Sequence, residues 1–147
     1  MSKGNSKNNE KIVKKLNQAL EMEISGVVRY LHYAFMIMGP NRIPIQKWFH
    51  EQAQEGYQHA TLLGEKITSL GGHPSLNVSK VPETSTHAVL EILKESLVFE
   101  EKALEIYHEL LVEVKEDVAL EEMVRQLIRT ETEHLDEVRK MLITKNN

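Results

Sequence analysis

The stretch GGHPSLNVSKVPETST, residues 71–86, decides how the rest of the chain can fold. It holds two glycines and two prolines and has no helical repeat of apolar side chains, so it predicts a non-helical connection. Fully extended, such a stretch spans roughly 50 Å at about 3.3 Å per residue, whereas a helix of about 28 residues is only about 42 Å long. The connection can therefore return along a whole helix, which leaves the helices before and after it parallel.

Apolar residues recur at helical spacing on both sides of this connection. A second group of turn formers, Gly39, Pro40 and Pro44, divides the first half of the chain. We predict a single domain over residues 1–147. Its helices are expected over about 9–38, 43–70, 85–114 and 117–144.

The connections between these helices predict how they pack. Ser85 or Thr84 is the expected N-cap of the third helix. The first two helices are joined by few residues, and so are the last two, at Lys115–Asp117, so each pair consists of antiparallel neighbours. With one long crossover between the second and third helices, the predicted fold is all-α: a four-helix bundle of ferritin-like topology.

Composition excludes several classes of protein. The chain has 41% hydrophobic and 27% charged residues, as an ordinary soluble globular protein does. It has no cysteine, which excludes disulfides, thiolate zinc sites and cysteine nucleophiles. A net charge of −4 gives no reason to expect nucleic acid or an anionic membrane as a partner. No apolar run could span a bilayer, and Met1–Lys15 has no apolar segment that marks secretion, so we expect a cytoplasmic protein.

Polar residues occupy positions where the helical repeat predicts an apolar core. A carboxylate buried alone is unfavourable, and it needs a partner, a proton or a cation. Glu23, His59, Glu100 and Glu131 each lie near the middle of a different predicted helix, so they should meet in one layer of the bundle. The complete candidate ligand set is Glu23, Glu55, His59, Glu100, Glu131 and His134.

Other side chains are expected beside this layer. Tyr30 follows Glu23 by seven residues, and Tyr107 follows Glu100 by seven, so each tyrosine lies two turns further along the same face. Either these tyrosines pack in the core, or their hydroxyls orient carboxylates by hydrogen bonds. Gln52 also faces inward and could supply an oxygen.

Four carboxylates and two imidazoles suit a pair of first-row metals, iron or alternatively manganese. A tetrahedral zinc site needs fewer ligands, and calcium does not favour histidine. Taken singly, each glutamate would more often belong to a solvated helix face, and each histidine would more often be a hydrogen-bonded core residue. Convergence from four helices is what favours the metal site.

Four stretches carry a resemblance to a known family: Leu16-Asn17 through Glu23 to Tyr30, His59-Ala60, Leu97-Val98-Phe99-Glu100, and Glu131 to His134. Through them the chain resembles the bacterioferritin branch of the ferritin-like family over nearly its whole length. In that family, two helices each give one Glu to a two-iron site and the other two each give a Glu-x-x-His pair. The resemblance implies that Glu23 and Glu100 are the lone glutamates and that Glu131 and His134 form one pair.

The second predicted helix departs from the family pattern. Gly56, not Glu, stands three residues before His59, and the nearest acid is Glu55, four before it. Offsets of three and four residues stay on one helix face, about 60° and 40° from the histidine, so Glu55 can still reach the metals. A one-residue π-bulge near Gly56 is the alternative.

Two further departures concern haem and assembly. Tyr57 stands where haem-binding bacterioferritins place a methionine, so haem is not expected. The chain also ends almost with the fourth predicted helix, which leaves no room for the fifth helix found in 24-subunit ferritin cages.

Three functional hypotheses follow. In the first, the chain is a di-iron ferroxidase of bacterioferritin type that binds Fe²⁺ and oxidises it with oxygen or hydrogen peroxide for iron storage or detoxification, as a homo-oligomer. In the second, it is a non-storage di-iron or iron–manganese oxidase, or a peroxide scavenger, that works as a dimer. In the third, it is a structural helical module without metal, which would require the acids to be exposed.

Overall fold

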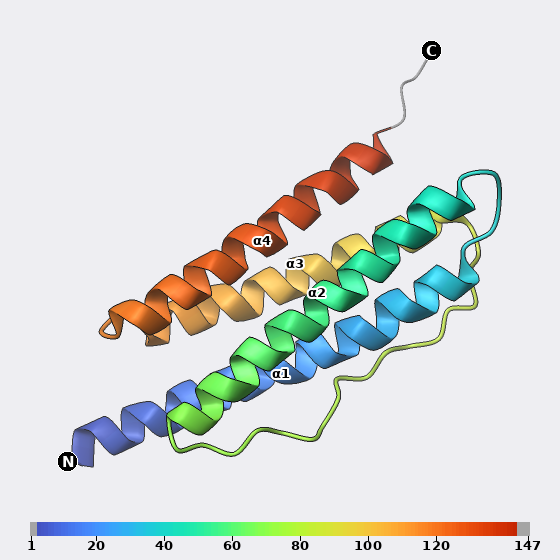
Figure 1. The fold of residues 1–147 in the computed structure, drawn as a ribbon. Helices are drawn as coiled ribbons and strands as arrows, with labels where there is room; N and C mark the ends of the chain where they lie inside the picture. The colour runs from blue at the N-terminus through green and yellow to red at the C-terminus, as the bar shows by residue number, and fades with distance from the viewer. Residues whose placement is uncertain (1–2, 144–147) are drawn as a thin grey trace.

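The computed structural model describes residues 3–143, with side chains from residue 6 onward. These residues form four α-helices and no strand, which confirms the all-α prediction. The helices are α1 (Lys3–Met36), α2 (Arg42–Ser69), α3 (Val89–Glu113) and α4 (Val118–Leu142) (Figure 1). Within residues 3–143, no helix has an apolar stretch suited to crossing a bilayer.

Two helix starts differ from the prediction. The first helix begins at Lys3 rather than at residue 9, because its first turns are polar in sequence and precede the apolar repeat from which the start was predicted. The third begins at Val89 rather than at residue 85, with Ala88 and not Ser85 or Thr84 as its N-cap. Ser85 has a φ of 55°, and its backbone N–H donates to the Glu83 carboxylate, so a tight turn occupies the expected first turn of the helix.

The fourth helix begins almost where it was expected. Asp117 is its N-cap, and the carboxylate accepts a 2.9 Å hydrogen bond from the backbone N–H of Leu120. Such a cap satisfies one of the free N–H groups at the start of a helix. The helix ends at Leu142, and the predicted end at residue 144 lies outside the described residues.

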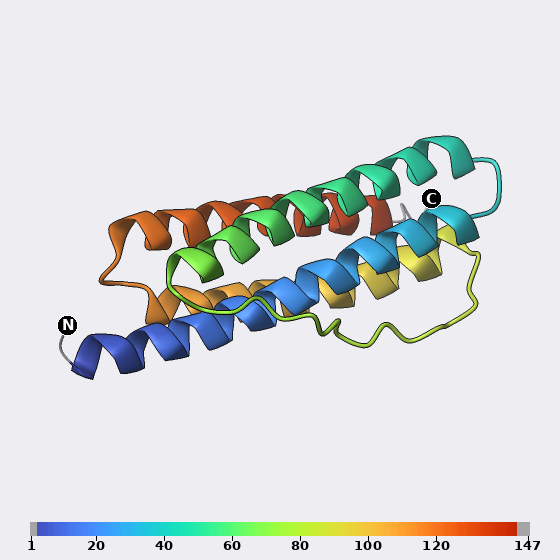
Figure 2. The same cartoon turned by 60° about the horizontal axis from the view of Figure 1, so that its bottom comes forward.

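The connection between α2 and α3 runs back along α1 (Figures 1 and 2). Near its start, the side chain of Asn17 on α1 donates to the carbonyl of His73 at 3.0 Å and accepts from the N–H of Ser75 at 2.8 Å. Near its end, the Nδ1 atom of His87 lies 2.6 Å from the carbonyl oxygen of Met36, in the last turn of α1. The connection therefore spans most of α1, and α2 and α3 run in the same direction.

The buried core is divided along the bundle axis. One apolar cluster contains Leu16, Leu63 and Leu120, toward the end where α3 joins α4. A second contains Phe49 and Ile92, toward the end where α1 joins α2. The buried polar residues Glu23, Gln52, Glu100 and Glu131 lie between the two clusters. One polar layer therefore crosses an otherwise apolar interior.

Candidate metal centre

All six predicted ligand residues line one small cavity in this polar layer. Each helix contributes to it: α1 gives Glu23, α3 gives Glu100, and α2 and α4 each give a glutamate and a histidine. The predicted convergence of the four helices is therefore present in the structure. Gln52 and Tyr30 line the same cavity.

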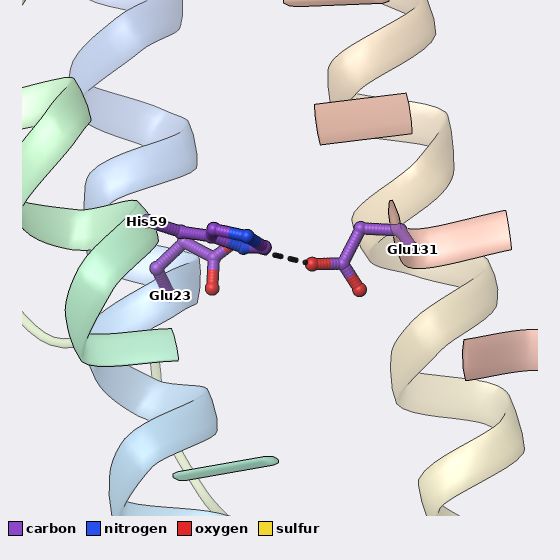
Figure 3. A group of neighbouring side chains, drawn as sticks. All are labelled: Glu23, His59 and Glu131. Carbon is purple, nitrogen blue, oxygen red and sulfur yellow. Dashed lines mark hydrogen bonds and ion pairs between the residues drawn. The ribbon is translucent and has the colours of Figure 1, made fainter. Parts of the chain in front are cut away.

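One group of possible ligands consists of Glu23, His59 and Glu131 (Figure 3). The Nδ1 atom of His59 lies 3.3 Å from Oε1 of Glu23 and 3.2 Å from Oε1 of Glu131. Glu23 and Glu131 are 5% exposed, so neither carboxylate has bulk water to solvate it.

A second group consists of Glu100, Glu131 and His134. The Nδ1 atom of His134 lies 3.6 Å from Oε2 of Glu131. Glu131 therefore belongs to both groups, with Oε1 toward His59 and Oε2 toward His134. A carboxylate with one oxygen in each of two groups of possible ligands could hold two cations, one on each oxygen.

On α2, the structure places Glu55 at the cavity without a bulge. The helix is a continuous α-helix through Gly56. Oε2 of Glu55 lies 2.6 Å from Nε2 of His134, and its Oε1 lies 3.9 Å from Nε2 of His59. A Cβ at Gly56 would lie 3.2 Å from Cγ2 of Val27 and 3.6 Å from Oε2 of Glu23. The small residue allows α1 and α2 to approach closely, so position 56 has little room for a longer side chain.

The two tyrosines form a crossed pair of hydrogen bonds. Tyr30 on α1 donates to Oε1 of Glu100 on α3, and Tyr107 on α3 donates to Oε1 of Glu23 on α1. Burial raises the pKa of both hydroxyls well above the ordinary range, so both remain protonated donors. The geometry favours the orienting role over plain packing. Sequence spacing related each tyrosine to the glutamate of its own helix and missed the cross-helix partner.

Burial also shifts the protonation of the acids. It raises the pKa of Glu23, and raises that of Glu100 well above its usual value. The Oε2 atom of Glu100 is buried and has no hydrogen-bond partner among the described residues. For Glu131, burial acts in the same direction, but the neighbouring Glu100 carboxyl and the imidazoles of His134 and His59 outweigh it and lower the pKa.

The pKa values of the two histidines are also raised, but by their carboxylate partners rather than by burial. Burial disfavours the charged imidazolium of His59, but hydrogen bonds to Glu131 and Glu23 outweigh it and raise the pKa to about 10. His134, held by Glu131 and Glu55, has a pKa raised to about 9 despite its burial. Without metal, these shifts favour protonated imidazoles and disfavour the ionised forms of Glu23 and Glu100.

These shifts predict how the stability of the metal-free protein depends on pH. An imidazole whose pKa is higher in the folded state stabilises fully below its unfolded value of about 6.5. The contribution of His59 is then lost as pH rises through about 10, and that of His134 through about 9. The raised pKa of Glu100 acts in the same direction.

We expect the unfolding free energy of EDTA-treated protein to fall between pH 7 and pH 10. The unfolding free energy should fall by up to about 1.4 kcal/mol per pH unit for each proton that is released on unfolding. Urea unfolding at fixed pH intervals measures it. The double variant His59→Leu, His134→Leu should flatten the curve, and an equally steep curve in that variant would contradict the assignment.

The donor set fits a pair of divalent cations. Four carboxylates and two imidazoles could neutralise two divalent charges once the histidines and carboxyls lose their protons. The Oε2 atom of Glu100 supports this fit. It is a buried oxygen that no described protein group satisfies, and a bound cation would satisfy it.

Comparison with known proteins agrees with the fold. The family model of the ferritin-like domain matches residues 13–145, and the chain belongs to this family. A comparison with curated proteins returns no match.

Several solved structures share the whole bundle. Ferritin-like, diiron-carboxylate proteins from Bacillus anthracis superpose with a TM-score of 0.88 at 25% identity, over 97% of this chain and 100% of theirs. A Dps protein from Thermosynechococcus elongatus has a TM-score of 0.89 at 17% identity, over 97% of both chains. The bacterioferritin of Desulfovibrio desulfuricans, whose diiron site was captured in different catalytic states, has a TM-score of 0.85 at 22% identity, over 96% of this chain and 83% of that one.

Proposed function

We propose that this chain is a di-iron ferroxidase of bacterioferritin type, which binds Fe²⁺ and oxidises it with oxygen or hydrogen peroxide in iron storage or detoxification. The observation that carries the proposal is the shared position of Glu131, whose two oxygens face the two histidines inside a buried cavity. The similarity to a diiron-carboxylate protein over the full chain supports it.

In this proposal, Fe²⁺ is the substrate and supplies the electrons. Two Fe²⁺ ions give two electrons, which with two protons convert oxygen to hydrogen peroxide or hydrogen peroxide to two waters. Glu131 would hold both ions. Glu23 and His59 together would hold one ion, and Glu100 and His134 would hold the other. Glu55 would complete the set from α2.

The remaining groups position these ligands. Tyr30 and Tyr107 would fix the rotamers of Glu100 and Glu23 by donating to Oε1 of each. The same Oε1 atom of Glu23 faces His59. Met22, Phe99 and Ala103 form apolar walls of the cavity. Such walls exclude water and strengthen the attraction between carboxylates and cations.

The proposal includes no haem. Tyr57, which stands in place of the haem-binding methionine of the family pattern, is 65% exposed on α2. The burial of the acids disfavours a purely structural helical module. That hypothesis requires solvated acids, whereas Glu23, Glu100 and Glu131 are buried. A dimeric oxidase or peroxide scavenger would use the same centre and differ in assembly.

Anaerobic titration with Fe²⁺, followed by air or hydrogen peroxide, tests the proposal. We expect binding to saturate at two Fe²⁺ per chain, and a rise in near-ultraviolet absorbance as Fe³⁺ forms. Glu133→Gln is the control for Glu131→Gln and should leave binding and oxidation unchanged. Glu133 is exposed, pairs with Arg129 and lies two residues from Glu131. Saturation at one ion per chain, or no oxidation, would refute the ferroxidase. The particle mass, measured beforehand by light scattering, distinguishes a storage assembly from a dimer.

A further inference from the structure

A methionine, Met22, forms part of the wall of the candidate metal centre. It lies on α1 next to Glu23 in the sequence and lines the same small cavity as the six candidate ligands. Among the residues that line this cavity, it is the one that contains sulfur. It is 5% exposed and also packs in the apolar cluster that contains Leu16 and Leu63. A reagent would therefore reach its side chain mainly from inside the cavity.

The wall beside Met22 is tightly packed. Gly26 lies four residues further along α1 and so on the same face of the helix. A Cβ atom at Gly26 would lie 3.1 Å from Cζ of Phe99 on α3, so the ring of Phe99 fills the space beside this glycine. On its other side, the guanidinium carbon of Arg29 lies 4.9 Å from the centre of that ring. Met22 therefore belongs to a closed part of the cavity wall.

The cavity has little free space. Its volume is about 10 Å³, near the smallest that holds one water molecule. Hydrogen peroxide is larger than water, so a peroxide molecule released in this cavity would lie in contact with the lining side chains. Two of these side chains, Tyr30 and Phe99, offer aromatic rings, whereas Met22 offers a thioether. A thioether is readily oxidised to a sulfoxide, which makes Met22 the expected target.

We propose that Met22 is a modification site, at which the thioether takes an oxygen atom from hydrogen peroxide formed at the metal centre. The inference rests on the proposed function, in which two Fe²⁺ ions reduce oxygen to hydrogen peroxide. A lone pair of the sulfur attacks one peroxide oxygen, the O–O bond breaks and an S–O bond forms. The second oxygen leaves as water with both peroxide hydrogens. The sulfur loses two electrons and the peroxide gains them, so methionine and hydrogen peroxide give methionine sulfoxide and water with no other reactant.

The chain contains a matched methionine outside the centre. Met38 follows the end of α1, is 53% exposed and does not line the cavity. Peroxide from solution should oxidise Met38 before Met22, because the buried thioether is shielded from solvent. Peroxide formed at the centre should oxidise Met22 first. The order in which the two methionines are oxidised therefore reports where the peroxide arises.

Peptide mass spectrometry measures this order, because each sulfoxide adds the mass of one oxygen atom. In one experiment, wild-type protein loaded with Fe²⁺ under argon is exposed to air, with catalase in solution to remove escaped peroxide. We expect Met22 sulfoxide to exceed Met38 sulfoxide several-fold. In the other experiment, metal-free protein is treated with dilute hydrogen peroxide, and we expect the reverse order. Absorbance of Fe³⁺, recorded in the first experiment, reports iron oxidation separately.

Two variants test whether the modification depends on the metal centre. Glu131→Gln weakens the shared ligand with little change in shape, and we expect it to lose Met22 oxidation when iron and air are added. Glu133→Gln is the control, since Glu133 is exposed and pairs with Arg129, and it should oxidise Met22 as wild type does. Circular dichroism checks that both variants are folded. The order of oxidation in the wild-type protein tests the inference without any variant.

The outcomes separate this inference from the proposed function. If iron is oxidised and Met22 gains oxygen before Met38, the modification site is supported. If iron is oxidised but Met22 gains oxygen no faster than Met38, the modification site is wrong and the ferroxidase stands. Equal oxidation of Met22 in wild type and Glu131→Gln would also overturn the modification site, because the peroxide would not come from the centre. If the wild-type protein does not oxidise Fe²⁺, the proposed function is wrong and the modification site falls with it.

Discussion

Fe²⁺ added under argon should raise the melting temperature of the wild-type protein by roughly 5–10 °C. A ligand that binds only the folded state stabilises it by mass action, by about 2.7 kcal/mol at a concentration one hundredfold above its dissociation constant. For a domain of this size, that free energy corresponds to several degrees. The buried carboxylates give the physical reason, because the folded metal-free protein keeps Glu23, Glu100 and Glu131 in close proximity with little solvent.

Glu100→Gln should produce opposite effects with and without metal. The substitution removes a carboxyl whose pKa is raised by burial and whose Oε2 has no hydrogen-bond partner among the described residues. The amide oxygen can still accept from Tyr30, while the amide NH₂ can donate toward Glu131. We expect the metal-free variant to be slightly more stable than wild type, by up to about 1 kcal/mol. Its metal affinity should fall at least about tenfold, because one charged ligand is lost.

Melting curves of both proteins, with and without Fe²⁺ under argon, decide this prediction. Glu101→Gln is the control, since Glu101 is the next residue but its side chain is 51% exposed and faces Arg139 at the surface. It should change neither stability nor the shift caused by metal. If Fe²⁺ does not change the melting temperature of the wild-type protein, the di-metal interpretation is wrong.

The sequence was most informative where one pattern constrained many residues. The stretch at residues 71–86 required a long connection, and the apolar repeats required helices, so the bundle followed from both. The six polar residues were identifiable because each interrupted an apolar stripe, and their equal depth in the helices predicted that they meet. Helix starts were less certain, because the turn at Ser85 depends on a local hydrogen bond from its N–H to Glu83.

Features that depend on side-chain rotamers were not predictable in the same way. Spacing places Tyr30 on the face of Glu23, but the hydroxyl reaches Glu100 on α3, which runs antiparallel to α1. The position of Glu131 between two donor groups likewise depends on where its two oxygens point. The bulge considered at Gly56 is absent from α2, since a regular helix already directs Glu55 to His134.

Glu131→Ala should abolish binding at both metal positions, the largest effect expected of any single substitution in this chain. The other candidate ligands belong to one group of ligand atoms each, or in the case of Glu55 to neither, whereas Glu131 belongs to both. Its removal takes one oxygen from each group and leaves His59 and His134 without the carboxylate between them. Because loss of one partner from a buried charged pair costs about 3–5 kcal/mol, the metal-free variant should also be less stable, unlike Glu100→Gln.

The stoichiometry of a small set of variants tests whether Glu131 is shared. Wild-type protein should bind two Fe²⁺ per chain under argon. His59→Ala and His134→Ala should each retain about one, because each removes a ligand from a single group. Glu131→Ala should retain none, and Glu131→Gln, which keeps the shape and one carbonyl oxygen, should bind at least about a hundredfold more weakly than wild type. Retention of one ion by Glu131→Ala would show that the carboxylate serves a single metal. Loss of both ions in either histidine variant would show instead that the two positions fill only together, so the histidine pair and the glutamate must be measured side by side.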